Sequence, residues 1–449
     1  MASNAKILSG AAGVLYDDRR DFYLRPNVVK ELWTDVTPFT TVVANQNTVS
    51  GLADPQFKMF EHRNPWVKQY FQSGDNAAIG GTADQTTDVT ISAGTIVGLE
   101  GEGAGQKPYE SWVGLQCEVW KSLTPSSTNK APQGHVLITG IKDADEIEVK
   151  NMGDGAFTPD ADSYYVVVGT AFGEGTNAAT AWADEIAVVY NQCQIFKTAC
   201  EVTGTLLEAA LRGESDELAR LRLQKSQEHK IQKERAFLFG RSPINMKAGF
   251  ADGSLTNDGS GTGNSGGAYV RSTMGIMAAL EKHGDDDSAS DNQNVFDITE
   301  ASYKYGDFVD DMEKVFQYIP DAGMKRAFCG AGALSYWSKM SGASGLAGNS
   351  GWTVNLGDMK RDSLGFNYRV LETPHGALQL IPTPVMRGPY NKMMLVVSDE
   401  NLFHAQYRAP KFQANILTDD AYDGVKDQYF SDEGIGITLL ESHKCFKII

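Results

Sequence analysis

The chain has few cysteines, no long apolar run and no excess of basic residues. Its five cysteines are far apart and include no C-x-x-C pair: Cys117, Cys193, Cys200, Cys329 and Cys445. This spacing predicts neither a zinc site nor a disulfide framework, and it fits a reducing cytoplasm. No stretch approaches the roughly 18 apolar residues of a membrane-spanning helix, and the N-terminus lacks the continuous apolar segment of a signal peptide.

Acidic residues outnumber basic ones, 57 to 40, which gives a formal net charge of −17. We therefore do not expect DNA to wrap on this surface through charge neutralisation, although a local basic face is compatible with the total. The 449 residues, 41% of them hydrophobic, suffice for two or three domains with cores of their own. The composition indicates a folded protein rather than a disordered one.

Two matches to catalytic motifs lie in unsuitable surroundings. Residues 261–266 match the G-x-G-x-x-G dinucleotide fingerprint, which needs a strand before it and a helix after it. Residues 263–267 match a nucleophile elbow around Ser265, which needs a strand-to-helix turn, an acid and a histidine. Both matches fall in the glycine-rich stretch 249–268, whose composition is typical of an exposed loop. We expect neither activity and keep a serine hydrolase as the least favoured alternative.

Other signals of chemistry are weak. The sequence has no H-E-x-x-H and no G-K-[ST] phosphate loop, and its seven histidines lie far apart. The acidic pairs and triplets at 285–287 and 419–420 lack the alternating ligand spacing of a calcium loop. We therefore predict no catalytic residue, no cofactor and no metal ion.

A long polar helix is predicted over residues 205–240, after the strand-like stretch 195–203. Thr205 to Glu208 matches a capping box. Ser215 can cap a second start of the helix, and Gly240 is a natural stop. A helix that is polar on nearly all sides needs ion pairs or cover from other molecules. We expect other copies of the same chain to cover it, and a solvated surface helix stays open as the alternative.

The cations of this helix alternate with Glu228 and Glu234. For that reason we expect ion pairs along the helix or across subunits rather than contacts with phosphates. Asp216 with Arg220 has the favourable i to i+4 spacing. The candidate inter-subunit contacts on the helix are its four basic residues in this part: Lys225, Lys230, Lys233 and Arg235.

Residues 1 to about 50 are predicted to form an arm in which charged and aromatic residues mix. Asn27 to Trp33 could form a short helix within it. An arm with exposed aromatic residues usually docks on another surface, and folding back on its own chain is the alternative. We expect inter-subunit contacts from five arm residues and one tryptophan: Tyr16, Arg19, Arg20, Phe22, Tyr23 and Trp66.

Residues 80–185 are predicted to form a small all-β domain. Short apolar runs are separated there by residues typical of turns, which favours a barrel or a sandwich. The region is an insertion, because strand-like sequence resumes at Ile186 to Tyr190. Helices are predicted over 271–283 and 299–319, and strands dominate beyond 363, including the continuously apolar Met393 to Val397. The whole is of the α+β class.

The chain resembles the major capsid proteins of tailed bacteriophages, with the Hong Kong 97-like fold, in a branch with a β domain inserted in the extended loop. The matching residues are Asn191 to Phe196, Val202 to Thr205, Asp216 to Ala219 and Glu234 to Gly240. The resemblance implies an N-terminal arm, an extended loop with its insertion, a peripheral domain with a spine helix, and an axial domain with returning peripheral strands. The arm is residues 1–50. The extended loop is 51–204, with its insertion at about 80–185. The peripheral domain is 205–320, with the spine helix at 205–240, and the axial domain with the returning strands is 321–449.

The resemblance also implies a function. Such proteins assemble as hexamers and pentamers of an icosahedral shell around double-stranded DNA, in the host cytoplasm, and become part of the virion. They work with a portal, a scaffold and in some cases decoration proteins, and no membrane is involved. The N-terminus has no long charged segment of a fused scaffold, so we expect a separate scaffold chain. A nanocompartment shell protein of the same fold, which encloses enzymes, is the alternative.

Overall fold

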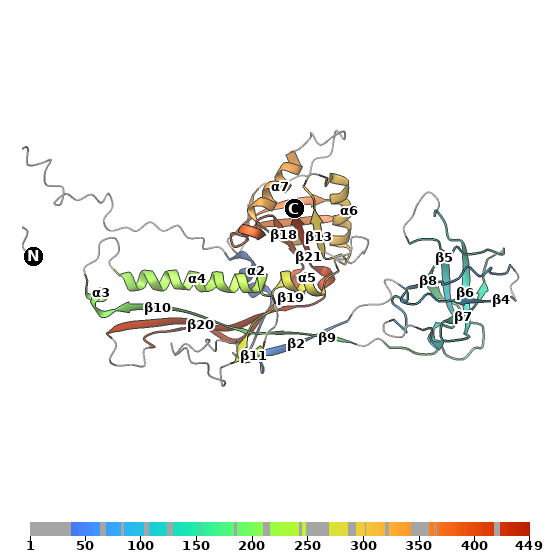
Figure 1. Cartoon of the computed structure of the whole chain (residues 1–449), viewed down its shortest axis with the longest axis horizontal. Coiled ribbons are helices and arrows are strands. Elements are labelled where there is room, and N and C mark those ends of the chain that lie inside the picture. Colours follow the sequence, from blue (N-terminus) through green and yellow to red (C-terminus); the bar gives the residue numbers. More distant parts are fainter. Residues whose placement is uncertain are drawn as a thin grey trace, which may run out of the picture. The chain divides into compact units, whose positions relative to one another are not determined.

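The computed structural model describes two compact units, residues 1–59 with 189–449 and residues 60–188 (Figure 1). Within them, the residues whose structure is described are 37–62, 69–81, 85–102, 107–123, 129–153, 155–183, 186–209, 216–241, 245–247, 269–285, 293–300, 302–318, 323–342, 359–362, 364, 366–416 and 423–449. Most of the predicted arm, the glycine-rich stretch 249–268 and Trp66 lie outside them.

A four-stranded sheet supports the long helix of the first unit. Its order is β1 (Thr48–Ser50), β19 (Leu402–Gln413), β20 (Gly424–Ile437) and β10 (Gln194–Thr203). Strands β10 and β20 pair in antiparallel fashion from Gln194 opposite Glu433 to Thr203 opposite Gly424. Helix α4 (Glu217–Phe239) packs against these two strands (Figure 1).

The helix prediction over 205–240 is partly confirmed. The described residues form two helices, α3 (Gly204–Glu208) and α4, and 210–215 lie outside the described part. The capping box at Thr205 is wrong: α3 starts one residue earlier, so Thr205 lies inside it, and its N-cap Thr203 makes no side-chain capping bond. The N-cap of α4 is Asp216, whose carboxylate accepts a hydrogen bond from the Ala219 N–H at 2.9 Å.

The predicted stop at Gly240 is confirmed, and close packing explains why glycine is there. Its N–H donates to the Ala236 carbonyl at 2.9 Å, and its carbonyl accepts from the Gly275 N–H at 2.8 Å. A Cβ at residue 240 would lie 2.4 Å from the Thr273 carbonyl oxygen. The tight crossing brings α4 against α5 (Ile276–His283).

A seven-stranded mixed sheet forms the second layer of this unit. In spatial order its strands are β13 (Val295–Ile298), β21 (Lys444–Ile448), β18 (Met393–Val397), β14 (Met324–Cys329), β17 (Gly376–Pro382), β16 (Asn367–Thr373) and β15 (Lys360–Arg361). β13 runs parallel to β21 and β14 parallel to β17, and the other pairs are antiparallel.

Both faces of this sheet are buried at its apolar strand β18. Met394 and Val396 belong to the core that contains Trp337 of α7 (Ala331–Gly342) and Phe308 of α6 (Tyr305–Phe316). Leu395 faces the core with residues of α5 and of α2 (Pro38–Gln46). Alternate residues of one strand thus serve two cores, because side chains alternate across a sheet.

Two short pairs of strands are also present. β2 (Gln56–Glu61) pairs with β9 (Ala187–Gln192) where the chain passes from one unit to the other, and β11 (Asn245–Lys247) pairs with β12 (Tyr269–Arg271) in the first unit.

The second unit is built on one antiparallel sheet of six strands. Their spatial order is β3 (Tyr70–Gln72), β8 (Tyr164–Thr170), β5 (Leu115–Trp120), β6 (Gly134–Ile141), β7 (Glu146–Asn151) and β4 (Thr86–Thr90). Phe71 stacks on Trp112 and Tyr165 at ring distances of 5.2 and 5.0 Å. Because β3 starts at Tyr70, the sheet begins about ten residues before the predicted start of the β domain at residue 80. The α+β class of the whole chain is confirmed.

Candidate functional site

One face of α4 meets a row of buried polar residues on β20. Arg222 and Lys233 of the helix pair with Asp427 and Glu433 of the strand, at 2.7 and 3.2 Å. Both carboxylates are fully buried. They lie at odd-numbered positions of β20 and so share one face of the sheet. The expectation that other molecules must cover this helix is therefore wrong for this face, because a strand of the same chain covers it.

His229 joins the helix to two neighbouring strands of the sheet, β10 at its edge and β20 beside it. Its Nδ1 lies 3.0 Å from the Thr198 hydroxyl of β10, and its Nε2 lies 3.0 Å from the Ser431 hydroxyl of β20. Burial, together with the nearby charge of Lys233, lowers the pKa of His229 to about 4. The ring is therefore neutral near pH 7, where one nitrogen can donate and the other accept.

A second set of charges converges on β20. The carboxylate of Asp432 is fully buried and pairs with Arg271 at 2.8 Å and with Arg408 at 3.0 Å. Glu433 also lies 3.0 Å from Nε2 of His404. Burial disfavours the charge of Glu433, but the hydrogen bond to His404 and the charge of Lys233 outweigh it, and the pKa of Glu433 lies below its usual value. The cluster thus favours the ionised form of Glu433 in the interior.

Near its end, α4 anchors α2, a helix in the last part of the predicted arm. Glu234 accepts hydrogen bonds from the first free N–H groups of α2, those of Phe39 at 3.1 Å and Thr40 at 2.8 Å. The N-cap of α2, Thr37, makes no side-chain capping bond, so Glu234 takes that role from another helix. Burial raises the pKa of Glu234 to about 7 despite these N–H donors.

This raised pKa predicts a pH dependence. Below its unfolded pKa of about 4.5, the Glu234 carboxyl is protonated in both the folded and the unfolded chain. As the pH rises from there to about 7, this carboxyl ionises freely only in the unfolded chain. The free energy of unfolding therefore falls over this range. The fall should be on the order of 3 kcal/mol. We expect Glu234→Gln to remove this term, so urea unfolding at pH 5 and pH 7.5 should differ less in the variant than in the wild type.

His229 acts in the opposite direction, because its lowered pKa adds stability as the pH rises through the range from about 4 to 6.5. The contribution of His229 is the same in Glu234→Gln and in the wild type, so it cancels when the two proteins are compared at each pH. Parallel curves for the two proteins would show that Glu234 is ionised in the folded chain throughout this range.

The four predicted contact residues on the helix have different environments. Lys225 pairs with Glu228 along the helix at 2.7 Å, as expected, and Lys233 is engaged with β20. Lys230 and Arg235 are exposed. Arg220 pairs with Glu217 and not through its side chain with Asp216 as predicted, because Asp216 is used as the N-cap. Contacts between subunits stay a prediction for all four.

The remaining predicted contacts, Tyr16, Arg19, Arg20, Phe22, Tyr23 and Trp66, lie outside the described residues, as does Ser265. The sequence analysis did not single out the buried acids of β20. Asp427 and Glu433 are partners of the helix, and Asp432 is the partner of Arg271 and Arg408. A weak signal was present, since Asp427, Ser431 and Glu433 have the even spacing of one strand face.

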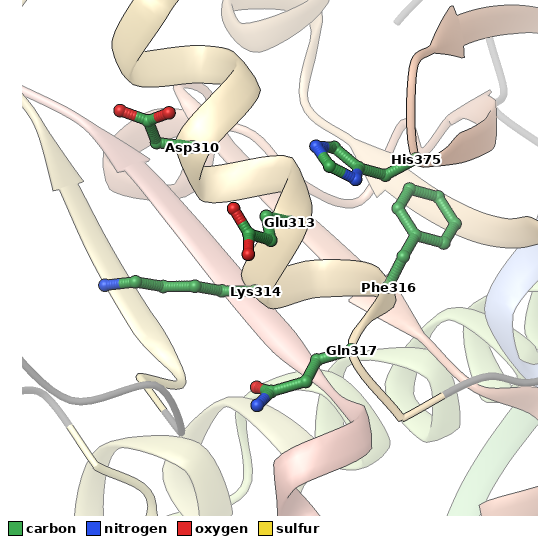
Figure 2. Close-up of a pocket in the computed structure, with 6 residues that line it drawn as sticks. All are labelled: Asp310, Glu313, Lys314, Phe316, Gln317 and His375. Carbon is green, nitrogen blue, oxygen red and sulfur yellow. The ribbon is translucent and has the colours of Figure 1, made fainter. Parts of the chain in front are cut away.

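A hollow elsewhere in the first unit collects charged residues without forming a metal site. It has a volume of about 420 Å³ and lies between α6, which provides Asp310, Glu313 and Lys314, and His375 of the β16–β17 turn (Figure 2). No group of three or more His, Cys, Asp or Glu residues that could hold a metal ion occurs among the described residues. Within the same residues, no helix is long and apolar enough to cross a membrane.

Several solved structures are similar to this chain. The capsid of a native GTA particle has 9% identity and a TM-score of 0.44, over 98% of this chain and 99% of the other. A chain from the structure of Gordonia phage Cozz has 10% identity and a TM-score of 0.38, over 62% of this chain and 77% of the other. The SrpI encapsulin of Synechococcus elongatus has 6% identity and a TM-score of 0.38, over 58% and 77%. TM-scores this low carry no argument about function.

No curated protein matches the chain. The family model described as SU10 major capsid protein matches residues 37–435, which include α2, α4, the second unit and every strand of the first unit's two large sheets except β21 and the last residues of β20. A match over most of the chain confirms the expectation of a tailed-bacteriophage major capsid protein: the chain belongs to the SU10 major capsid protein family.

Proposed function

We propose that this protein assembles as hexamers and pentamers of an icosahedral shell that encloses the double-stranded DNA of a tailed bacteriophage. The observation that supports this most strongly is the family match over residues 37–435. The polar helix α4 fits the role, because one face is held by its own sheet and Leu223, Lys230 and Arg235 on the remainder are exposed. Burial of such residues between subunits would offset the entropy of ordering them.

In this proposal the ranges of the sequence analysis become parts of the subunit. Residues 1–50 are the arm, 51–204 the extended loop with its inserted β domain, 205–320 the peripheral domain with its spine helix, and 321–449 the axial domain with returning peripheral strands. The charge of −17 keeps free subunits apart through mutual repulsion.

The proposed partners are a portal, a separate scaffold chain and decoration proteins, and the DNA is enclosed without recognition of its sequence. Assembly takes place in the cytoplasm of the host bacterium, and the protein then resides in the virion. We propose no catalytic role and no cofactor.

Electron microscopy after gel filtration tests this proposal. We expect closed shells, tubes, or rings of five and six subunits, with or without co-expressed scaffold. A monomer or dimer under all these conditions would overturn it. Shells that hold enzymes and no DNA would favour the nanocompartment, and loss of a measurable activity in Ser265→Ala without a change in oligomeric state would favour the hydrolase.

A further inference from the structure

A second hollow lies between α4 and the parts of β19 and β20 next to the hairpin that joins them. Its volume is about 260 Å³. Lys230 and Lys233 line it from the helix, and Lys411 lines it from β19. Rings from the two strands form much of the remaining wall, among them those of Pro410, Phe412 and Tyr429. The hollow is therefore both cationic and aromatic.

The charge of this hollow is unbalanced within the described residues. No carboxylate lines it, and of its three lysines only Lys233 has an ion pair there, with Glu433 at 3.2 Å. Lys230 and Lys411 are exposed. Phe412 is a large apolar side chain that is 45% exposed. Two available ammonium groups beside exposed rings suit an occupant that has carboxylates on either side of an aromatic or apolar anchor.

The described part of the chain begins close to this hollow. Glu234 holds the N–H groups of Phe39 and Thr40, so the first described residues lie beside this position of α4. Lys230 is one helical turn earlier, about 6 Å along the axis. Trp33 is four residues before residue 37 and can lie no farther than about 14 Å from it. The hollow is thus within reach of the segment before α2.

The sequence of that segment complements the hollow. Residues 31–35 read Glu-Leu-Trp-Thr-Asp, with one carboxylate on each side of the tryptophan. Tryptophan is the aromatic residue that interacts best with cations and is enriched among anchors that fill pockets. Duplex DNA fits less well, because contacts to its backbone need charges spread along the duplex rather than a ring-lined hollow.

We propose that residues 31–35 of the same chain bind this hollow, with the Trp33 indole against Pro410, Phe412 and Tyr429. The carboxylates of Glu31 and Asp35 then lie beside Lys230 and Lys411. Because the segment is tethered at α2, its effective concentration at the hollow is high, and modest contacts suffice to hold it. This inference does not depend on the proposed shell.

Hydrogen exchange of the full-length chain, read by mass spectrometry, tests the proposal. We expect the amides of residues 28–36 to exchange at least tenfold more slowly than in an unstructured peptide. The double variant Lys230→Glu/Lys411→Glu should remove most of this protection, and adding Glu31→Lys/Asp35→Lys should restore it. The variant Lys121→Glu/Lys142→Glu changes the net charge equally in the other unit and should have no effect on these amides.

A second variant separates binding from folding. Trp33→Ala should accelerate exchange in residues 28–36 while the buried strand β18 stays protected. Free exchange of the segment in the wild type would overturn the proposal, and so would protection that both variants leave intact. Protection that grows with protein concentration would assign the segment to a second copy. If a short DNA duplex protects the hollow while residues 28–36 exchange freely, the occupant is nucleic acid and the proposal fails.

Discussion

Replacing Asp432 by alanine is expected to lower the free energy of unfolding by about 3–5 kcal/mol, the cost of breaking a buried ion pair by removing one partner. The carboxylate is fully buried and is shared by Arg271 of β12 and Arg408 of β19. Without it, two guanidinium groups would face each other with no intervening negative charge. Urea unfolding of the unassembled chain at pH 7 measures the loss as a lower midpoint.

A matched control involves the same strand, β20. Glu201 of β10 and Lys426 of β20 are 3.2 Å apart, and each side chain is 39% exposed. Solvent-exposed pairs contribute about 0–1 kcal/mol, so Glu201→Ala should shift the midpoint little. Equal effects of the two variants would contradict the importance of burial. A loss below about 1 kcal/mol for Asp432→Ala would show that the arginines find other partners.

The ends of α4 could be predicted from the sequence because they depend on neighbouring residues. Gly240 ends the helix as expected, and the capping residue is Asp216, next to the predicted Ser215. Capping uses a side chain and N–H groups two or three positions away, so its signal is local. The start of α3 was missed by one residue, because Gly204 adopts helical geometry before Thr205 can act as a cap.

The partners of α4 could not be predicted, because they are remote in sequence. Asp427 and Glu433 are about 200 residues from Arg222 and Lys233, and only the pairing of β10 with β20 brings them under the helix. From the sequence alone, a helix that is polar on all sides indicated cover by other molecules. The structure shows that a strand with buried acids of the same chain covers one face.

The candidate contacts between subunits were predicted as a single set, and the structure divides them. Lys233 is largely buried, its side chain 12% exposed and paired with Glu433. Arg235, two residues later, is exposed. Helical geometry places residues two positions apart on different faces, so neighbouring cations of α4 have separate roles. Composition does not reveal this division, because it depends on which face the sheet covers.

Lys233→Glu is therefore expected to affect folding, and Arg235→Glu assembly. The first change puts a carboxylate beside fully buried Glu433 and removes its cation, which should cost about 3–5 kcal/mol of unfolding free energy. The second changes an exposed side chain and should alter stability by less than about 0.5 kcal/mol. Urea unfolding gives the first quantity, and the yield of particles in electron micrographs gives the second.

The comparison separates a structural role from a role in assembly because both variants change the charge of the same helix by the same amount. If Arg235→Glu keeps its stability and loses its particles, the outer face of α4 contacts a neighbouring subunit. Normal particles from Arg235→Glu would remove this residue from the interface. If Lys233→Glu is as stable as the wild type, Glu433 must be protonated in the folded variant. The unfolding free energy should then fall as the pH rises above 7, because only the unfolded chain has this carboxylate freely ionised.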